Sequence, residues 1–265
     1  MKKHLIIGDP VNHSLSPKIH NYWFKKNNIH GIYEKITPRL KEISNIINQI
    51  KTGNLHGINV TVPFKQKVIP LLEELSPTVK KTNSVNTIFK KEGKVYGDNT
   101  DVFGFSLALK DAGYYINKKK ALILGAGGVA PSLVVSLYNL GIGKIYMSNR
   151  TDSKLDNLIE NFPNIEKIPW GKFEEVDLII NATSVGLKRE DNLNLNYDKF
   201  GKNKFFYDVI YNPRMTNFLK EAKKNNHKFV NGKMMFIYQA QKAFELWHGF
   251  LPKIDGELIK LLEND

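Results

Sequence analysis

Residues 121–130 read Ala-Leu-Ile-Leu-Gly-Ala-Gly-Gly-Val-Ala, and this stretch decides the fold. The four apolar residues 121–124 are typical of a strand that is buried on both faces of a parallel sheet. Gly125, Gly127 and Ala130 match G-x-G-x-x-A, the turn that brings a dinucleotide pyrophosphate to a helix N-terminus. The strand–turn–helix context favours this interpretation over its alternative, an ordinary tight turn.

The end of the next predicted strand, residues 144–148, indicates which dinucleotide the turn takes. An NAD site usually carries Asp or Glu there for the ribose 2′-hydroxyl, but residues 149–151 are Asn-Arg-Thr and the first acid is Asp152. A guanidinium suits the 2′-phosphate of NADP, so Arg150 favours NADP, unless it is only a solvated turn residue. The predicted cofactor contacts here are Gly125, Ala126, Gly127, Gly128, Val129, Asn149, Arg150 and Thr151.

Strand-like and helix-like segments alternate on both sides of this turn. Strands are expected at 5–7, 31–36, 55–62, 144–148, 176–181, 205–209 and 228–230, with a hairpin at 85–89 and 94–96. Helices are expected at 16–27, with Ser16 as N-cap before Pro17, and at 40–50, 101–112, 129–140, 151–161 and 217–225. A long helix and a short one follow within 234–265.

This alternation predicts a two-domain α/β fold. Residues 1–100 are expected to form an N-terminal α/β substrate-binding and catalytic domain. Residues 101–232 are expected to form a Rossmann-type, doubly wound dinucleotide-binding domain. The C-terminal helices, residues 233–265, are expected to return and pack on the N-terminal domain.

Composition excludes several classes of protein. The 265 residues are 42% hydrophobic and 25% charged, which is ordinary for a globular chain. No apolar run reaches 18 residues, and the run after the N-terminal lysines is only residues 5–7, so neither a membrane span nor a signal peptide is predicted. A cytoplasmic location is the expectation. The absence of cysteine excludes disulfides and thiolate chemistry, and the seven histidines show no paired ligand spacing, so no metal is predicted.

The net charge of +13 does not by itself predict nucleic-acid binding. Only four of the 39 basic residues are arginine, whereas base readout relies on arginine forks. The lysines are spread along the whole chain, and a positive field also steers small anions. We therefore expect a small acidic substrate, no nucleic acid and no membrane as partner, and the oligomeric state is left open with a homodimer as one option.

Small polar residues gather in four segments of the first predicted domain: Ser14 and Ser16, residues 59–65, Asn86, and residues 97–101. Ligand sites in α/β sheets lie at the carboxyl ends of strands, so these groups would suit a polyhydroxylated carboxylic acid. The alternative treats the serines and aspartates as helix caps and Lys65 as a surface charge.

The chain resembles the shikimate dehydrogenase family over nearly its whole length. The segments that carry the resemblance are 14–21, 59–65, 85–87, 97–101, 125–130, 149–151, 181–186, 208–213 and 235–239. One departure is Val102, where the family usually has glycine after Gly-Asp-Asn-Thr-Asp.

The resemblance implies roles for individual residues. Lys65 and Asp101 would form the catalytic pair, with Lys65 as acid and base. The substrate would be held by Ser14, Ser16, Thr61, Lys65, Asn86, Asp101, Tyr211 and Gln239. Val209 and Gly232 match positions at the nicotinamide end of the cofactor.

The activity implied is the NADP-dependent, reversible reduction of 3-dehydroshikimate to shikimate, a step of chorismate and aromatic amino acid biosynthesis. Three alternatives stay open: a quinate/shikimate dehydrogenase that uses NAD, a non-catalytic NADP-binding regulator of the same fold, and a basic nucleic-acid-binding protein. The absence of an acid at residues 149–151 argues against the first, and the presence of both Lys65 and Asp101 against the second.

Overall fold

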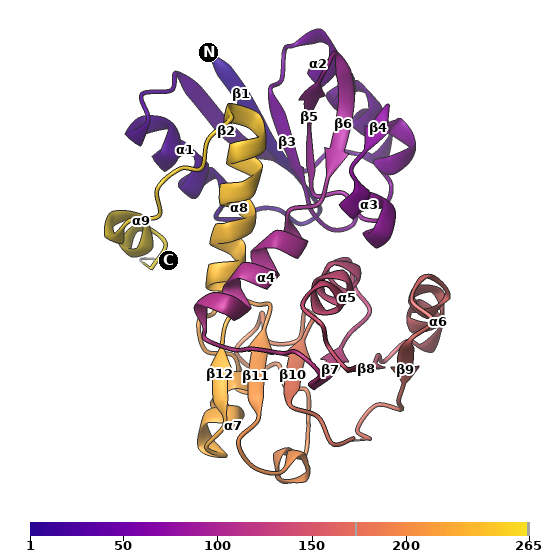
Figure 1. Cartoon of the computed structure of the whole chain (residues 1–265). Helices are drawn as coiled ribbons and strands as arrows, with labels where there is room; N and C mark the ends of the chain where they lie inside the picture. Colours follow the sequence, from indigo (N-terminus) through magenta and orange to yellow (C-terminus); the bar gives the residue numbers. More distant parts are fainter. Residues whose placement is uncertain (173, 264–265) are drawn as a thin grey trace. The chain divides into compact units, whose positions relative to one another are not determined.

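The computed structural model describes residues 1–172 and 174–263 and divides the chain into two compact units. Unit 1 comprises Met1–Gly104 and Ile237–Asp265, and unit 2 comprises Phe105–Phe236. Each unit is built on its own six-stranded sheet (Figure 1). The predicted two-domain α/β fold is therefore confirmed. The chain passes between the units inside helices α4 and α8, a few residues after residues 100 and 232.

Unit 1 holds a mixed sheet of order β2-β1-β3-β5-β6-β4. Strands β1, β2 and β3 are parallel, whereas β5 pairs antiparallel with β3 and with β6, which is the predicted hairpin. The strands are β1 (Lys2–Ile7), β2 (Gly31–Ile36), β3 (Gly57–Val60), β4 (Glu74–Leu75), β5 (Thr87–Lys91) and β6 (Lys94–Asp98). The helices are α1 (Ser16–Lys26), α2 (Ile43–Thr52), α3 (Pro77–Thr82), the first part of α4 (Asp101–Asp111), most of α8 (Lys233–His248) and α9 (Gly256–Leu261).

Two different cores cover this first sheet, because side chains alternate between its faces. An aliphatic core joins α2 to the sheet and includes Ile7, Ile47 and Ile58. The other core is aromatic and joins α1 to α8, with Trp23 and Phe244 both fully buried and their rings 5.6 Å apart. The C-terminal segment is tied to α1 as well, because the Trp23 indole donates to the Lys253 carbonyl and the Tyr22 hydroxyl to Asp255.

Unit 2 holds a parallel sheet of order β12-β11-β10-β7-β8-β9 (Figure 1). Counted from its first strand, this is the Rossmann order 3-2-1-4-5-6, with the strand order reversing at β7. The strands are β7 (Lys120–Leu124), β8 (Lys144–Ser148), β9 (Ile165–Lys167), β10 (Leu178–Asn181), β11 (Phe205–Asp208) and β12 (Lys228–Val230), and the connecting helices are α5 (Ala130–Asn139), α6 (Asp152–Asn161) and α7 (Asn217–Lys224).

The structure differs from the sequence prediction at short elements and at one cap. Strands β4 and β9 and helix α3 were not predicted, because two to six residues carry too little periodicity to be recognised. Residues 40–42 form a 3-10 turn before α2. Ser16 is the first residue of α1 and not its N-cap, a position that belongs to Leu15; the Ser16 hydroxyl makes a buried contact instead. In the described part of the chain, the helices are too short or too polar to cross a membrane.

Candidate functional site

The centre of the site in unit 1 is an ion pair between Lys65 and Asp101. The Lys65 Nζ lies 2.5 Å from Asp101 Oδ2, and the two side chains are only 11% and 10% exposed. Lys65 follows β3 in the loop, and Asp101 opens α4. Thirty-six positions separate them along the chain, so the tertiary fold brings together the two residues that the resemblance paired. About a tenth of each side chain remains exposed to solvent.

Asn86 holds the other oxygen of the aspartate. Its Nδ2 donates to Asp101 Oδ1 at 2.9 Å and to the Thr100 hydroxyl at 3.0 Å, while its Oδ1 accepts from the Thr100 N–H at 2.8 Å. The Thr100 hydroxyl also reaches Gln239 Oε1, at 3.5 Å, which brings α8 into the same site. Lys65 and Asn86 each donate to a different oxygen of Asp101, and the hydrogen bonds of the Asn86 amide fix its orientation.

A chain of hydrogen bonds leads from this pair to the predicted serines. Thr87 accepts from Asn59 Nδ2 and donates to Asn86, and Asn59 Oδ1 accepts from the Tyr33 hydroxyl at 2.7 Å. The Ser16 hydroxyl contacts Tyr33 and receives a 3.2 Å hydrogen bond from Ser14. Tyr33 was missed from the sequence. Asn59 belongs to the polar segment 59–65 that the sequence singled out, although no individual role was predicted for it.

Thr61 is the first residue after β3, and its N–H donates to the Ile7 carbonyl at 2.9 Å. Val102 is the second residue of α4 and is 7% exposed. Its side chain is packed in the protein, so the departure from the family's glycine adds little to the exposed surface of the site.

The glycine-rich turn of unit 2, which the sequence predicts to bind a dinucleotide, lies between β7 and α5. Gly125 has φ +105° and its N–H bonds the Ser148 carbonyl, while a Cβ there would stand 2.8 Å from Thr183. A Cβ on Gly127 would meet no protein atom closer than 3.7 Å. The protein itself therefore requires glycine at residue 125, whereas the exposed Gly127 leaves room for a ligand on the α5 N-terminus. The residues present fit a pyrophosphate.

Asn149 and Arg150 follow β8 in different environments. Asn149 Oδ1 accepts from the Ala126 N–H at 3.1 Å, and its Nδ2 donates to the Thr151 carbonyl. This side chain therefore links the glycine-rich turn to the loop that follows β8. Arg150 and Thr151 are exposed. An exposed guanidinium with no acid beside it in sequence fits the 2′-phosphate of NADP.

Val209 and Gly232 are brought together, although 23 positions separate them. A Cβ on Gly232 would lie 2.1 Å from the Val209 carbonyl oxygen, so only glycine permits this crossing of the backbone. Tyr211 also belongs to unit 2, where its ring stacks on Phe236 at 4.6 Å. Its predicted contact with the substrate stays a prediction.

Asp208, at the end of β11, is the buried charge nearest to Val209 in sequence. It accepts from the Thr216 hydroxyl at 2.6 Å, from Asn181 Nδ2 at 3.1 Å and from the Ile210 N–H at 3.0 Å. Burial nevertheless raises the pKa of the Asp208 carboxyl to about 6, and these hydrogen bonds oppose the rise. The network joins the ends of β10 and β11 to the start of α7.

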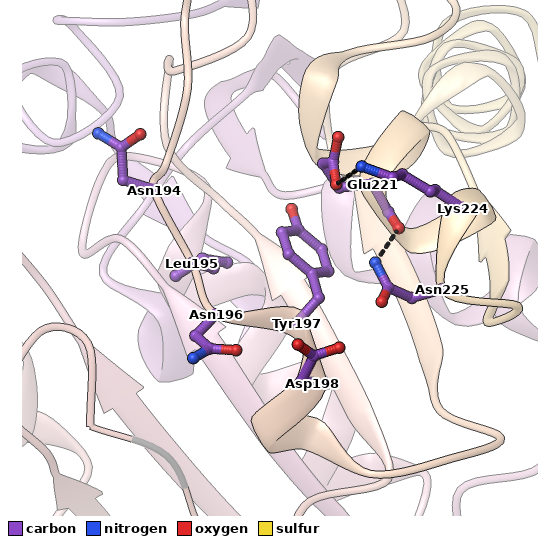
Figure 2. A pocket seen from close by; sticks show the side chains of 8 residues that line it. All are labelled: Asn194, Leu195, Asn196, Tyr197, Asp198, Glu221, Lys224 and Asn225. Carbon is purple, nitrogen blue, oxygen red and sulfur yellow. Dashed lines mark hydrogen bonds and ion pairs between the residues drawn. The ribbon is translucent and has the colours of Figure 1, made fainter.

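A separate hollow of about 560 Å³ lies on unit 2 between the residues after Asn194 and the end of α7 (Figure 2). Figure 2 shows Lys224 turned toward Glu221, and Asn225 donating to the Glu221 carbonyl. Its lining is Asn194, Leu195, Asn196, Tyr197, Asp198, Glu221, Lys224 and Asn225, so no predicted site residue contributes to it.

No group of three or more His, Asp or Glu side chains among residues 1–172 and 174–263 is arranged to hold a metal ion. Four histidines do gather in unit 1, with the His4 ring 6.0 Å from that of His56 and 5.2 Å from that of His248. His20 lies nearby against Trp247. Phe24, Trp247 and Phe244 pack against these imidazoles, and the ring contacts indicate aromatic packing rather than ligation.

A Rossmann unit with a pyrophosphate turn, joined to a unit with a shielded lysine–aspartate pair, defines the class of two-domain NAD(P)-dependent dehydrogenases. Comparisons with known proteins give the family. Residues 6–88 match the model described as shikimate dehydrogenase substrate binding domain, and residues 106–228 match the one described as shikimate / quinate 5-dehydrogenase. The chain belongs to the shikimate dehydrogenase family, which confirms the resemblance seen in the sequence.

Individual relatives agree over the full length. The chain is 54% identical over 262 residues to the shikimate dehydrogenase (NADP(+)) of Pelagibacter ubique, and the alignment covers 99% of each. A solved structure from Thermus thermophilus, in complex with NADP(H) and shikimate, is 33% identical with a TM-score of 0.89 and 99% coverage of both chains. One from Listeria monocytogenes, in complex with shikimate and NAD, is 28% identical with a TM-score of 0.90, covering 99% of this chain and 96% of that one.

Proposed function

We propose that this chain is an NADP-dependent shikimate dehydrogenase, which reversibly reduces 3-dehydroshikimate to shikimate. The observation that carries the proposal is the shielded Lys65–Asp101 ion pair, 2.5 Å long, on a unit whose companion is a Rossmann unit with Arg150 after its second strand. The family membership and the NADP-bound relative support the same reaction.

The chain's own chemistry is a proton transfer at Lys65. Lysine ordinarily carries its proton at neutral pH, so the ammonium can give that proton to the C3 oxygen as the carbonyl is reduced. In the reverse direction the resulting amine takes the hydroxyl proton back. Asp101 holds Lys65 by one oxygen and is itself held by Asn86 through the other, which fixes the direction of the Nζ–H bonds. Positioned acids of this kind contribute about 10²- to 10⁴-fold in rate.

The remaining residues of unit 1 would bind the substrate. Ser14 and Ser16 are hydroxyl donors suited to a carboxylate, and their mutual contact places both at one end of the hydrogen-bond chain. Asn86, Gln239 and Thr61 are neutral donors and acceptors suited to ring hydroxyls. The substrate then lies with its acid at the serines and its reacting carbon at Lys65.

The residues of unit 2 would hold NADP, which when bound supplies or accepts the hydride at C3. Gly127, Gly128 and the N–H groups at the start of α5 would take the pyrophosphate, and Arg150 with Thr151 would take the 2′-phosphate. Val209 and Gly232 would meet the nicotinamide end. These proposed contacts are supported by the free space beside Gly127 and by the exposure of Arg150.

The test is cofactor reduction by the purified chain with shikimate and either NADP or NAD, for the natural sequence and for Arg150→Ala. We expect turnover with NADP to exceed that with NAD at least tenfold, since a bidentate Arg–phosphate contact is worth about 1.5–3 kcal/mol. Arg150→Ala should remove most of this preference. Equal loss with both cofactors would mean that Arg150 does not read the 2′-phosphate, and no turnover with either would refute the activity. Better turnover of quinate with NAD would select the NAD-dependent alternative.

A homodimer and a cytoplasmic location remain predictions from the sequence. Sedimentation of the purified chain, and fractionation of cells that express it, would decide them.

A further inference from the structure

The two partners of the ion pair lie on separate backbone segments, and one buried side chain joins those segments. Asn99 is 3% exposed and lies two residues before Asp101. Its Oδ1 accepts from the Asp101 N–H at 3.0 Å, and its Nδ2 donates to the Ser84 carbonyl at 2.8 Å. The next residue, Val85, donates its N–H to the Lys65 carbonyl at 2.9 Å. Asn99 thus connects the backbone of Asp101, through Ser84 and Val85, to the backbone of Lys65.

Each of these two Asn99 hydrogen bonds pairs a polar group of the buried backbone. Asp101 is the first residue of α4, and the first N–H groups of a helix have no partner within the helix. The Asn99 oxygen supplies one. The Ser84 carbonyl lies in the buried turn between α3 and β5, where an unpaired acceptor is costly. The Asn99 amide supplies the shorter of two hydrogen bonds to it, and the Thr82 hydroxyl supplies the other at 3.2 Å. Because a carbonyl only accepts and an N–H only donates, the amide has a single orientation.

We propose that Asn99 is a positioning residue for the reaction: it sets the start of α4 against the segment that carries Lys65, and so keeps the carboxylate of Asp101 in line with the Lys65 ammonium. Asn99 meets Asp101 at the backbone N–H of that residue. Its effect passes through the backbone, and a displacement of about 1 Å in a catalytic group can cost up to 10²-fold in rate. The inference rests on the proposed dehydrogenase function, because kcat is its readout.

The experiment measures kcat and KM for Asn99→Ala in the natural sequence and in the Lys65→Ala background. We expect Asn99→Ala to lower kcat about tenfold with Lys65 present, and by less than about twofold in the Lys65→Ala background. Without the Lys65 ammonium, a displaced Asp101 has no proton donor to orient, so its position no longer affects proton transfer. KM for shikimate should change less than kcat. A loss caused only by a smaller folded fraction would lower kcat by the same factor in both backgrounds, and that result would overturn the inference.

A milder variant and a matched control complete the test. Asn99→Ser keeps an oxygen near the Asp101 N–H, as serine does in such turns, but cannot reach Ser84; it should fold and still lower kcat several-fold with Lys65 present. Asn192→Ala removes an equivalent hydrogen bond, from the Asn194 N–H to Asn192 Oδ1, on an exposed loop of unit 2; it should leave kcat within about twofold. Unchanged kcat in both Asn99 variants would also overturn the inference. An inactive natural sequence would instead refute the proposed function.

Discussion

At the scale of single residues, the site depends on which hydrogen-bond or ion-pair partner each polar atom has. Lys65 and Asp101 are shielded yet not fully buried, and their charges compensate each other. Removing one partner of such a pair leaves the other charge poorly solvated, which costs far more than the loss of an exposed pair. The same substitution therefore affects both rate and stability, and the two effects must be measured separately.

Lys65→Ala is expected to lower kcat at least 10²-fold with little change in the KM for shikimate, because the proton donor acts mainly in the transition state. Steady-state kinetics in both directions, with thermal unfolding to correct for the folded fraction, is the measurement. Lys67→Ala is the matched control: this exposed lysine lies two residues further on, and its loss should change kcat less than about twofold. A Lys65→Ala enzyme with near-natural kcat would remove Lys65 from the chemistry.

At the scale of elements, the β7–α5 turn separates two reasons for a glycine. Gly125 is required by the protein, since its positive φ and the nearby Thr183 exclude a side chain. A Cβ on Gly127 would meet the Ala182 carbonyl oxygen at 3.7 Å, an ordinary contact distance, so the protein itself leaves room for a methyl group there. Sequence motifs treat both positions alike, whereas the structure distinguishes a folding constraint from a binding constraint.

Gly127→Ala should therefore leave Tm within about 2 °C and weaken NADP binding about tenfold or more, because its methyl group occupies the space that a pyrophosphate needs. Gly125→Ala should lower Tm, since backbone strain of this kind costs about 1–3 kcal/mol. Calorimetric titration with NADP and thermal unfolding are the measurements, with the exposed Gly256→Ala on α9 as control. Natural NADP affinity in Gly127→Ala would show that the cofactor does not approach this turn.

At the scale of the whole molecule, buried histidines of unit 1 and the buried Asp208 of unit 2 link stability to pH with opposite signs. In unit 1, burial and then neighbouring histidines lower the pKa of His4 to about 2, and burial lowers that of His20 to about 3. His56, His248 and Lys2 are the other charged or titratable groups of this cluster. In unit 2, burial raises the pKa of Asp208 to about 6.

The sign follows from proton binding in the folded and unfolded chains. Below about pH 6.5 the unfolded chain protonates His4 and His20 but the folded chain does not, so the stability of unit 1 falls as pH falls, by up to about 1.4 kcal/mol per pH unit for each. Between about pH 6 and 4 the folded chain keeps a proton on Asp208 that the unfolded chain releases, so this group makes unit 2 less stable as pH rises.

We expect the unfolding temperature of unit 1 to drop between pH 7 and pH 5. Tryptophan fluorescence measures it, because Trp23 and Trp247 lie in or beside the histidine cluster. His4→Phe should reduce this pH dependence, since the ring keeps its place between Phe24 and Trp247 without a titrating group. His13→Gln, at an exposed position, should leave it unchanged. An equal drop in His4→Phe would mean that the cluster does not cause the acid sensitivity.

The sequence by itself determined the two α/β domains, the Rossmann unit, the NADP preference suggested by Arg150 and, through the resemblance, the pairing of Lys65 with Asp101. These features are readable because hydrophobic periodicity and glycine spacing are local properties of the chain. Tertiary structure alone decided that Asn86, Asn99 and Thr100 converge on Asp101, that Tyr33 and Asn59 extend this network to the serines, and that four histidines meet at α8. Those contacts join residues far apart in the chain, and which buried donor finds which acceptor is fixed only when the sheet, its helices and their loops are packed together.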